Sequence, residues 1–292
     1  MAVYEIKNEE LTAKINTYGG ELVSLVRNAT GKEYIWNADE AFWKRSSPIL
    51  FPFVGSTKNK TYTYEGVEYP TAQHGFARDM EFDVNFKENA EIWFQITETE
   101  ETKKIYPFDF TLMLGYVLEG DSLLVKWKVV NDGDQKMYFS IGAHPAFFCP
   151  NAEGDKQTDC MLRFDCKSGF IYGLTNDDGL VISDSNYLTL DNGEVPIDEH
   201  FFDEGAYIIE NDQTHAIALV GSDHKSYVTV KFDAPLVGIW SPPKKSAPFV
   251  CIEPWYGRCD RVDFMGELSE REWENELEPA QTFEASYTIS VK

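Results

Sequence analysis

Short runs of alternating apolar and polar residues, separated by turn residues, make up most of this chain. The alternation is clear at 11–16 (LTAKIN) and 122–131 (SLLVKWKVVN), and aromatic and β-branched residues are frequent. A period of two is typical of strands with one buried face. The ranges that we predict as strands are 2–6, 11–16, 21–26, 34–36, 62–64, 82–86, 92–97, 110–118, 122–131, 138–143, 160–164, 206–210, 216–220, 226–232, 237–240, 249–254 and 281–290.

Many short strands at this spacing predict an all-β fold, a large antiparallel β-sandwich with few short helices. We expect long loops at 150–160 and 176–186. No internal repeat, low-complexity segment or linker-like stretch divides the chain. We therefore expect residues 1–292 to form a single domain.

Amphipathic helical patterns are scarce. The best candidate is 268–277 (LSEREWENEL), where Ser269 is a plausible N-cap and Glu272 follows three residues later. A side-chain acceptor at the N-cap with a glutamate at the third helical position is the pattern of a capping box. We predict a short surface helix here.

The charge of the chain excludes several classes of partner. The 49 acidic residues outnumber the 26 basic ones, for a formal net charge of -23. Such a chain repels phosphate backbones and anionic lipid surfaces, so we expect neither a nucleic-acid partner nor a membrane partner.

The cysteines and the N-terminus point to the cytoplasm. The five cysteines form no CxxC pair and are odd in number, which favours reduced thiols. The N-terminus lacks the apolar core of a signal peptide, and no stretch approaches 18 apolar residues. We expect a cytoplasmic protein.

Two of the five histidines stand in unusual surroundings. His200, His215 and His224 lie in polar, acidic segments, where a solvated loop histidine is the ordinary interpretation. His74 (QHGFAR) and His144 (GAHPAFF) instead lie beside glycine or proline and next to aromatic residues. Such surroundings restrain the backbone and provide an apolar wall around a polar ring. A structural role for either histidine stays open at this point.

Glu253 is the unusual acid. It lies in FVCIEPWYGR, near the end of an apolar strand, where a carboxylate is costly to bury unless it is hydrogen-bonded or used. One alternative is a structural ion pair with Arg258. With the two histidines and Trp255, it suggests proton-transfer chemistry on a polar, ring-shaped substrate whose apolar face stacks on an aromatic side chain.

A metal or another cofactor is not expected. Two histidines and a glutamate could bind a metal, but the three lie in distant segments without an HxH or HExxH motif. The phosphate-binding patterns GxGxxG and GxxxxGK are missing, as is the nucleophile elbow GxSxG.

Four segments together resemble the aldose 1-epimerase (galactose mutarotase-like) superfamily, and in particular its LacX-type branch. They are PILFPFVG (48–55), HGFAR (74–78), GAHPAF (142–147) and CIEPW (251–255), which occur in the family's order across nearly the whole chain. The resemblance implies a β-supersandwich. It also implies a metal-independent isomerase that interconverts the α and β anomers of an aldohexose, such as galactose.

The resemblance also implies roles for individual residues. Glu253 matches the catalytic base, His144 the catalytic acid, and His74 the histidine that binds the sugar. Arg78 is expected to line or brace the site, and Arg45 matches an arginine that often precedes the LFP segment. Trp255 or Phe147 is expected to provide a stacking wall.

The sequence departs from the family pattern at two places. Residues 56–60 (STKNK) stand where relatives often have an arginine after the glycine that corresponds to Gly55. Gly205 aligns with an aspartate that contacts sugar hydroxyls in relatives, so Asp203 or Glu204 is expected to replace it. These departures leave the identity of the sugar open.

Three alternatives remain at the level of the sequence. The first is a mutarotase for hexose 6-phosphates, with the phosphate held by cations from the set Arg45, Lys58, Lys60 and Arg78. The second is a non-catalytic protein that binds or senses carbohydrate, and the third is a metal-dependent isomerase of cupin type. The sequence also leaves open whether the chain forms a homodimer.

Overall fold

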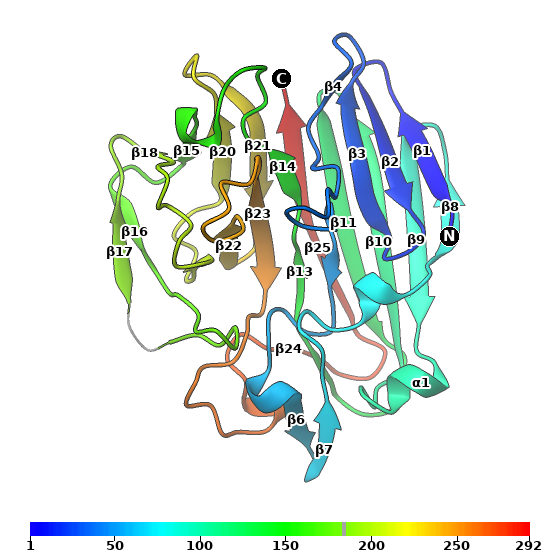
Figure 1. Cartoon of the computed structure of the whole chain (residues 1–292). Coiled ribbons are helices and arrows are strands. Elements are labelled where there is room, and N and C mark those ends of the chain that lie inside the picture. Colours follow the sequence, from blue (N-terminus) through cyan, green and yellow to red (C-terminus); the bar gives the residue numbers. More distant parts are fainter. Residues whose placement is uncertain (183–184) are drawn as a thin grey trace.

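The computed structural model describes residues 1–182 and 185–292 and shows a β-sandwich of two main layers (Figure 1). One layer is a nine-stranded antiparallel sheet that extends across the whole width of the molecule in Figure 1. Its strands, in order, are β18 (Glu194–Pro196), β15 (Met161–Phe164), β20 (Ala216–Val220), β21 (Ser226–Phe232), β25 (Thr282–Val291), β11 (Ser122–Asn131), β10 (Phe110–Glu119), β9 (Glu91–Thr97) and β8 (Asp83–Lys87).

Two smaller sheets form the second layer, in front of the nine-stranded sheet in Figure 1. The first is formed by β1 (Val3–Lys7), β2 (Leu11–Asn16), β3 (Glu21–Arg27) and β4 (Lys32–Glu33). The second follows the order β19 (Tyr207–Ile209), β22 (Leu236–Trp240), β23 (Phe249–Tyr256), β13 (Ile141–Ala143) and β5 (Ile49–Leu50), with β14 (Ala146–Phe148) also paired to β23.

Short hairpins, strand pairs and helical turns complete the described part of the chain. The paired strands are β6 (Thr61–Tyr64) with β7 (Val67–Pro70), β12 (Met137–Phe139) with β24 (Asn275–Leu277), and β16 (Gly169–Tyr172) with β17 (Asn186–Thr189). The helical elements are α1 (Glu100–Lys103) and the 3₁₀ turns Lys58–Lys60, Ala77–Asp79, Gln157–Asp159 and Leu268–Glu270. Across the described residues, these helical elements are too short and too polar to span a bilayer.

The predicted fold class is confirmed. The structure is predominantly β, its main sheets are antiparallel, and the helices are few and short. One predicted strand, 138–143, is divided in two at Ser140, whose backbone N–H donates to the Pro52 carbonyl while its hydroxyl donates to Glu274. The loop expected at 176–186 includes residues 183–184, which lie outside the described part.

The predicted helix at 268–277 is wrong. Only Leu268–Glu270 is helical, as a 3₁₀ turn with Glu267 rather than Ser269 at the N-cap position, and the segment ends in β24. Two tertiary effects oppose a helix. Arg271 is drawn inside by Asp260 and Glu274, and Trp273 adopts a left-handed backbone conformation with φ of 63°. A helical pattern does not reveal such buried partners.

The hydrophobic core fills the space between the layers, and it explains the alternation in the strands. Inward side chains of the nine-stranded sheet, such as Phe94, Leu114 and Val125, pack in one cluster with Ile15 and Leu22 of the opposite layer. The same cluster also includes Val250 and Ile252 of β23. The alternate residues of β23 face away from this core, so the strand is buried on both faces.

A buried ionic cluster supports the connection that leads from β23 to β24. Arg271 binds Asp260 at 2.7 Å and Glu274 at 2.6 Å, and all three side chains are buried. Burial raises the pKa of Glu274 from 4.5 to about 7, although Arg271 and the Ser140 hydroxyl oppose that shift. Glu274 therefore binds its proton more tightly in the folded chain than in the unfolded one.

This linkage predicts a pH-dependent stability. Between pH 4.5 and about pH 7 the unfolded chain releases the Glu274 proton while the folded chain keeps it, so stability falls as pH rises. The loss is on the order of 3 kcal/mol. We expect Glu274→Gln to have a smaller loss than wild type between these pH values in denaturant unfolding. Glu276→Gln, on the exposed face of β24, is the control; parallel curves for wild type and Glu274→Gln would contradict the prediction.

Candidate functional site

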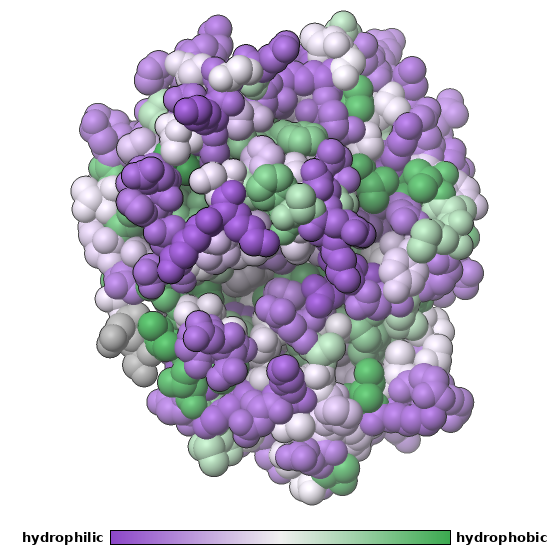
Figure 2. Space-filling model, in the orientation of Figure 1, coloured by the Kyte–Doolittle hydropathy of each residue, from purple (hydrophilic) through white to green (hydrophobic). Residues whose placement is uncertain are grey.

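A cleft of about 1140 Å³ opens beside the six-stranded sheet. His144 and Glu253 line it together with His74, Arg78, Asp203 and Trp255, so six of the seven site residues predicted from the sequence lie on one surface. Figure 2 shows that this face of the molecule is mostly hydrophilic and is hollowed near its middle. Arg45 does not line the cleft.

The register of three strands brings His144 and Glu253 together. β13 pairs Gly142 with Trp255, and β14 pairs Ala146 with Cys251. Both ladders have the same offset, so His144 lies directly opposite Glu253, on the same face of the sheet. The two side chains meet with His144 Nε2 3.4 Å from Glu253 Oε2. β13 ends before His144, and β14 begins directly after Pro145, which has no backbone N–H to donate to a neighbouring strand.

Burial dominates the electrostatics of this pair. Glu253 is 1% exposed and His144 8%, and neither Glu253 Oε2 nor His144 Nδ1 makes a hydrogen bond with any residue that the structure describes. Burial raises the pKa of Glu253 well above 4.5, which the nearby indole N–H of Trp255 partly opposes. Burial and the positive charge of Arg78 lower the pKa of His144 from 6.5 to about 3. Burial therefore disfavours a charge on either group.

Arg258 is not the partner of Glu253. Its guanidinium is buried and binds Glu210 and Glu272. The structural ion pair that the sequence left open for Glu253 is therefore wrong, and the carboxyl group stays free for the cleft.

A strained loop orients His74. His74 and Gly75 both have positive φ, 65° and 68°, and the His74 backbone N–H donates to the Gly55 carbonyl. The Gly55 backbone N–H in turn donates to His74 Nδ1 at 3.0 Å. A neutral imidazole whose Nδ1 accepts carries its proton on Nε2, so His74 offers an N–H to the cleft.

His74 stays neutral because of where it lies. Burial lowers its pKa well below 6.5, and the neighbouring His144, Arg78 and Arg45 add to the effect. The two imidazole rings are 5.6 Å apart between centroids. A hydrogen-bond donor and the His144–Glu253 pair therefore face the same space.

Aromatic side chains surround His144 on two sides. Its ring lies 4.7 Å from that of Trp43, tilted by 30°, and 5.5 Å from that of Trp240 in an edge-on arrangement. Both tryptophans line the cleft, and sequence reasoning missed them. The one signal in the sequence for a role of Trp240 was its position, as an aromatic residue at the end of a predicted strand.

Trp255 lies flat on the sheet over two glycines. A Cβ on Gly238 would approach its ring to 2.4 Å, and one on Gly142 to 2.6 Å. These neighbours therefore have to be glycine for the indole to occupy this position. Phe147, the other aromatic residue considered for the wall, is fully buried in the main core instead.

The arginines divide into one that lines the cleft and one behind it. Arg78 lines the cleft and donates to the Gln73 carbonyl at 2.7 Å. Arg45 binds Asp79 at 2.6 Å and the Arg78 carbonyl at 3.3 Å. Its guanidinium thus contacts the backbone of the HGFAR segment.

Glu21 is a buried support that the sequence did not reveal. Its carboxylate accepts the backbone N–H groups of Ser46 and Ser47 at 2.6 and 2.9 Å. These residues precede Pro48, whose carbonyl accepts the His144 backbone N–H. Glu21 therefore fixes the segment against which His144 lies.

The outer part of the cleft is acidic. Outside the buried pair, the lining of the cleft includes four acids, Asp177, Asp178, Asp203 and Glu204, and three lysine or arginine residues, Lys60, Arg78 and Lys244. Asp203 is also bound by the exposed His200, 2.9 Å away. Lys58, one of the cations considered for a phosphate, turns away and donates to the Phe264 carbonyl.

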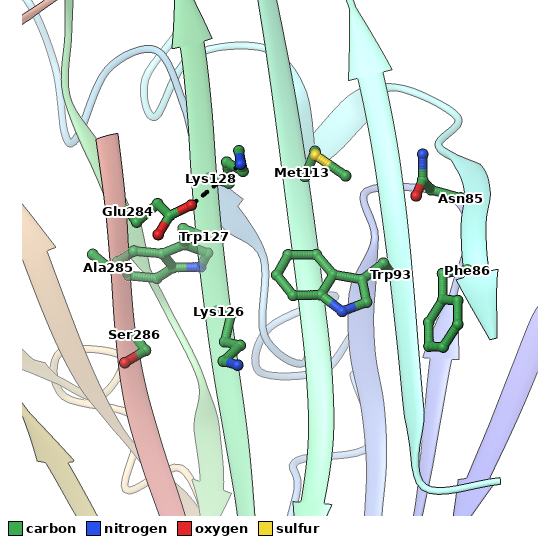
Figure 3. A pocket seen from close by; sticks show the side chains of 10 residues that line it. All are labelled: Asn85, Phe86, Trp93, Met113, Lys126, Trp127, Lys128, Glu284, Ala285 and Ser286. Atoms are coloured by element: carbon green, nitrogen blue, oxygen red, sulfur yellow. Dashed lines mark ion pairs between the residues drawn. The ribbon is translucent and has the colours of Figure 1, made fainter. Parts of the chain in front are cut away.

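A second hollow, of about 670 Å³, lies on the nine-stranded sheet (Figure 3). Trp93 covers Gly115 there, and Lys128 pairs with Glu284 at 3.2 Å. As far as the chain is described, none of the residues that line this hollow is a histidine. It therefore offers no counterpart to the His144–Glu253 pair.

The fold and the site define a class of antiparallel β-sandwich proteins with a buried histidine–carboxyl pair in an open cleft. The family model described as aldose 1-epimerase matches residues 2–272, and the chain belongs to this family. The resemblance found in the sequence is thereby confirmed. Membership supports a general mutarotase function and a sugar as the small-molecule partner.

Individual relatives agree with this assignment. "Protein LacX, plasmid" of Lactococcus lactis subsp. lactis is 31% identical over 296 residues, which cover 98% of both chains. A galactose mutarotase related enzyme from Lactobacillus acidophilus matches at a TM-score of 0.95 with 32% identity, over 100% of this chain and 97% of that one. A galactose mutarotase-like protein from Lactobacillus casei matches at a TM-score of 0.93 with 29% identity, over 100% of both chains.

The His74 loop provides a test of the site's geometry. A Cβ on Gly75 would lie 2.2 Å from the Phe51 carbonyl oxygen, and its φ is 68°. We expect Gly75→Ala to cost more than about 2 kcal/mol of unfolding free energy. Gly120→Ala is the matched control, because Gly120 has a φ of 58° but nothing within 4 Å, and it should cost only about 1 kcal/mol. Equal losses in denaturant unfolding would show that the contact with Phe51 is relieved easily.

Proposed function

We propose that this protein is a mutarotase of free aldohexoses in which Glu253 is the base and His144 the acid. The observation that supports this proposal most directly is the separation of 3.4 Å between the two side chains in an open cleft. Among residues 1–182 and 185–292, Glu253 Oε2 has no hydrogen-bond partner. A pair with this spacing can act on two oxygens attached to one carbon, such as O1 and O5 of a pyranose.

Ring opening and closure need only proton transfers. Glu253 takes the proton of the C1 hydroxyl while the protonated His144 gives its proton to O5, and the C1–O5 bond breaks to leave an open-chain aldehyde. After rotation about the C1–C2 bond, the O5 hydroxyl attacks the other face of C1. His144 then takes back the O5 proton and Glu253 returns a proton to O1. The pair holds one proton at every stage, and no electron leaves the sugar.

General acid–base catalysis supplies enough acceleration for this reaction. Each group contributes roughly 10²–10⁴-fold, so two independent groups lower the barrier by roughly 5–11 kcal/mol. The uncatalysed reaction already proceeds slowly in water. The proton steps therefore need no metal and no other cofactor.

The buried environment supports the exchange of a single proton. In water the single proton of such a pair lies on the histidine. Burial raises the pKa of Glu253 and lowers that of His144, which favours the neutral arrangement with the proton on Glu253. Ring opening starts with the proton on His144, and ring closure starts with it on Glu253. A catalyst of a reversible reaction needs both states to be accessible.

The remaining residues around the cleft are suited to hold a sugar. The Nε2–H of His74 can donate to a ring or hydroxyl oxygen beside the pair. Trp43, Trp240 and Trp255 offer apolar surfaces against which a pyranose can lie. Arg78 and Asp203 are proposed to bind hydroxyl groups, with Arg45 positioning Arg78 from behind.

A free sugar suits the charges of the cleft better than a hexose 6-phosphate. Of the four cations considered for a phosphate, only Lys60 and Arg78 line the cleft, joined there by Lys244. The four acids of this surface that lie outside the buried pair, Asp177, Asp178, Asp203 and Glu204, oppose a dianion, and the net charge of -23 adds to that repulsion. A non-catalytic sugar-binding protein is not favoured, because a binder has no need of an unpartnered buried carboxyl group.

Two substitutions test the proposed pair. We expect Glu253→Gln and His144→Asn each to lower kcat for the interconversion of α- and β-glucose or galactose by roughly 10²–10⁴-fold, because each removes one proton-transfer group. The approach to anomeric equilibrium is followed by polarimetry or NMR, with free and 6-phosphorylated hexoses compared.

The control is His224→Asn, which changes an exposed histidine outside the cleft lining and should leave the rate within about twofold. A folded wild type that accelerates neither free nor phosphorylated hexoses would refute the proposed function. If it bound these sugars without accelerating their equilibration, the carbohydrate-binding alternative would be correct.

A further inference from the structure

His144 and Glu253 have a third neighbour with a different chemistry, the thiol of Cys251. Cys251 and Glu253 are two residues apart on β23, and their side chains therefore point to the same face of the strand. One ligand atom from each of His144, Cys251 and Glu253 lies within 4.8 Å of the other two. Cys251 itself does not line the cleft and is fully buried beside the pair.

The register explains why these three side chains meet. Cys251 lies opposite Ala146 on one side and Trp240 on the other, one row away from the row of Glu253 and His144. Ala146, the neighbour on the side of His144, is small. Trp240, the neighbour on the other side, is the large side chain of this row, and its ring lies 5.5 Å from that of His144. The sequence motif CIEPW thus supplies two of the three groups from a single strand.

Nitrogen, sulfur and oxygen donors in this arrangement form the ligand set of a soft or borderline divalent cation. Zinc binds Cys sulfur at about 2.3 Å and His nitrogen or carboxylate oxygen at about 2.0–2.2 Å, so tetrahedral ligands lie about 3.3–3.8 Å apart. The His144–Glu253 separation of 3.4 Å already falls in this range. The separations that involve the thiol are at most 4.8 Å, so the sulfur has to move by about 1 Å to reach the same range. Glu253 Oε2 has no competing hydrogen bond to give up.

We propose that His144, Cys251 and Glu253 bind a single Zn²⁺, or another thiophilic cation such as Cd²⁺, with the fourth position open to the cleft. In this step Cys251 Sγ, an imidazole nitrogen of His144 and a carboxylate oxygen of Glu253 each form a bond to the metal. The thiol proton, and the proton that the His144–Glu253 pair holds, pass to solvent or buffer. No oxidation state changes.

Such binding blocks acid–base chemistry rather than supporting it. The metal occupies the lone pairs that His144 and Glu253 need for proton transfer, so Zn²⁺ and substrate exclude each other. This inhibitory consequence rests on the proposed function, whereas the binding of the metal does not. Mg²⁺ and Ca²⁺ prefer oxygen ligands in larger numbers and should not bind here.

Binding is measured on the purified, EDTA-treated full chain with Co²⁺ and Zn²⁺ as the probes. Co²⁺ bound by a thiolate has a ligand-to-metal charge-transfer absorption in the near ultraviolet, which a site without sulfur lacks. We expect this band in wild type, and none in Cys251→Ala. Calorimetry with Zn²⁺ should show one site per chain, weakened more than about tenfold by Cys251→Ala.

Cys259→Ser is the matched control, because Cys259 is a buried cysteine that lines the cleft but is not part of the cluster. It should keep the Co²⁺ band. Cys251→Ala removes a side chain outside the cleft lining, so its anomerisation rate in EDTA should equal that of wild type while its inhibition by Zn²⁺ is lost. Cooperative thermal unfolding verifies that each variant is folded.

The outcomes separate this inference from the proposed function. The metal site would be overturned, whatever the activity, if wild type had neither the Co²⁺ band nor Zn²⁺ binding. It would also be overturned if the band persisted in Cys251→Ala or disappeared in Cys259→Ser. A band that depends on Cys251 in a protein that does not equilibrate sugars would support the metal site and refute only the function. Inhibition of wild type by Zn²⁺ and not by Mg²⁺, lost in Cys251→Ala, supports both.

Discussion

The site depends on one row of residues that crosses the six-stranded sheet. This row contains Gly238, Glu253 and His144. β22 places Gly238 beside Glu253, and the common offset of the β13 and β14 ladders places His144 on its other side. Because β23 is buried on both faces, the carboxyl group meets only the side chains of adjacent rows and whatever enters the cleft. A shift of this register by one residue would turn His144 to the other face of the sheet.

Burying this acid has a free-energy cost that the surrounding structure must offset. An unpartnered carboxyl group in an apolar strand is destabilising, and its elevated pKa expresses the same cost. The core between the layers, with Val250 and Ile252 of the same strand, supplies compensating hydrophobic burial. This arrangement resembles other sites in which reactivity is maintained at the expense of stability.

Supports around the row act mainly through the backbone. Gly55 fixes the tautomer of His74, Glu21 holds the segment that receives the His144 N–H, and Arg45 holds the backbone of Arg78. The result is a neutral donor and a one-proton pair within a cleft whose rim is acidic. An acidic rim is compatible with a neutral polyol and opposes an anion. The sequence alone allowed either, because it offered Arg45, Lys58, Lys60 and Arg78 as ligands of a phosphate.

Some elements could be predicted because they depend on local periodicity. The strands at 11–16 and 122–131 have the same bounds in the structure, since a half-buried strand imposes the alternation that identifies it. The helix at 268–277 failed because Arg271 has buried acidic partners and Trp273 a left-handed backbone, neither of which follows from the pattern. Trp43 and Glu21 were missed for a similar reason, because their neighbours come from distant segments.

The sequence by itself determined the fold class, the family and the identity of the unusual acid and histidines, because alternation and short motifs are written in adjacent residues. Only the tertiary structure decided that Arg258 is engaged elsewhere, that Phe147 faces the core, and that Cys251 joins His144 and Glu253. Those outcomes depend on strand register and on which face of a strand a side chain occupies. Both are settled by pairing between segments about a hundred residues apart, as β13 and β14 pair with β23.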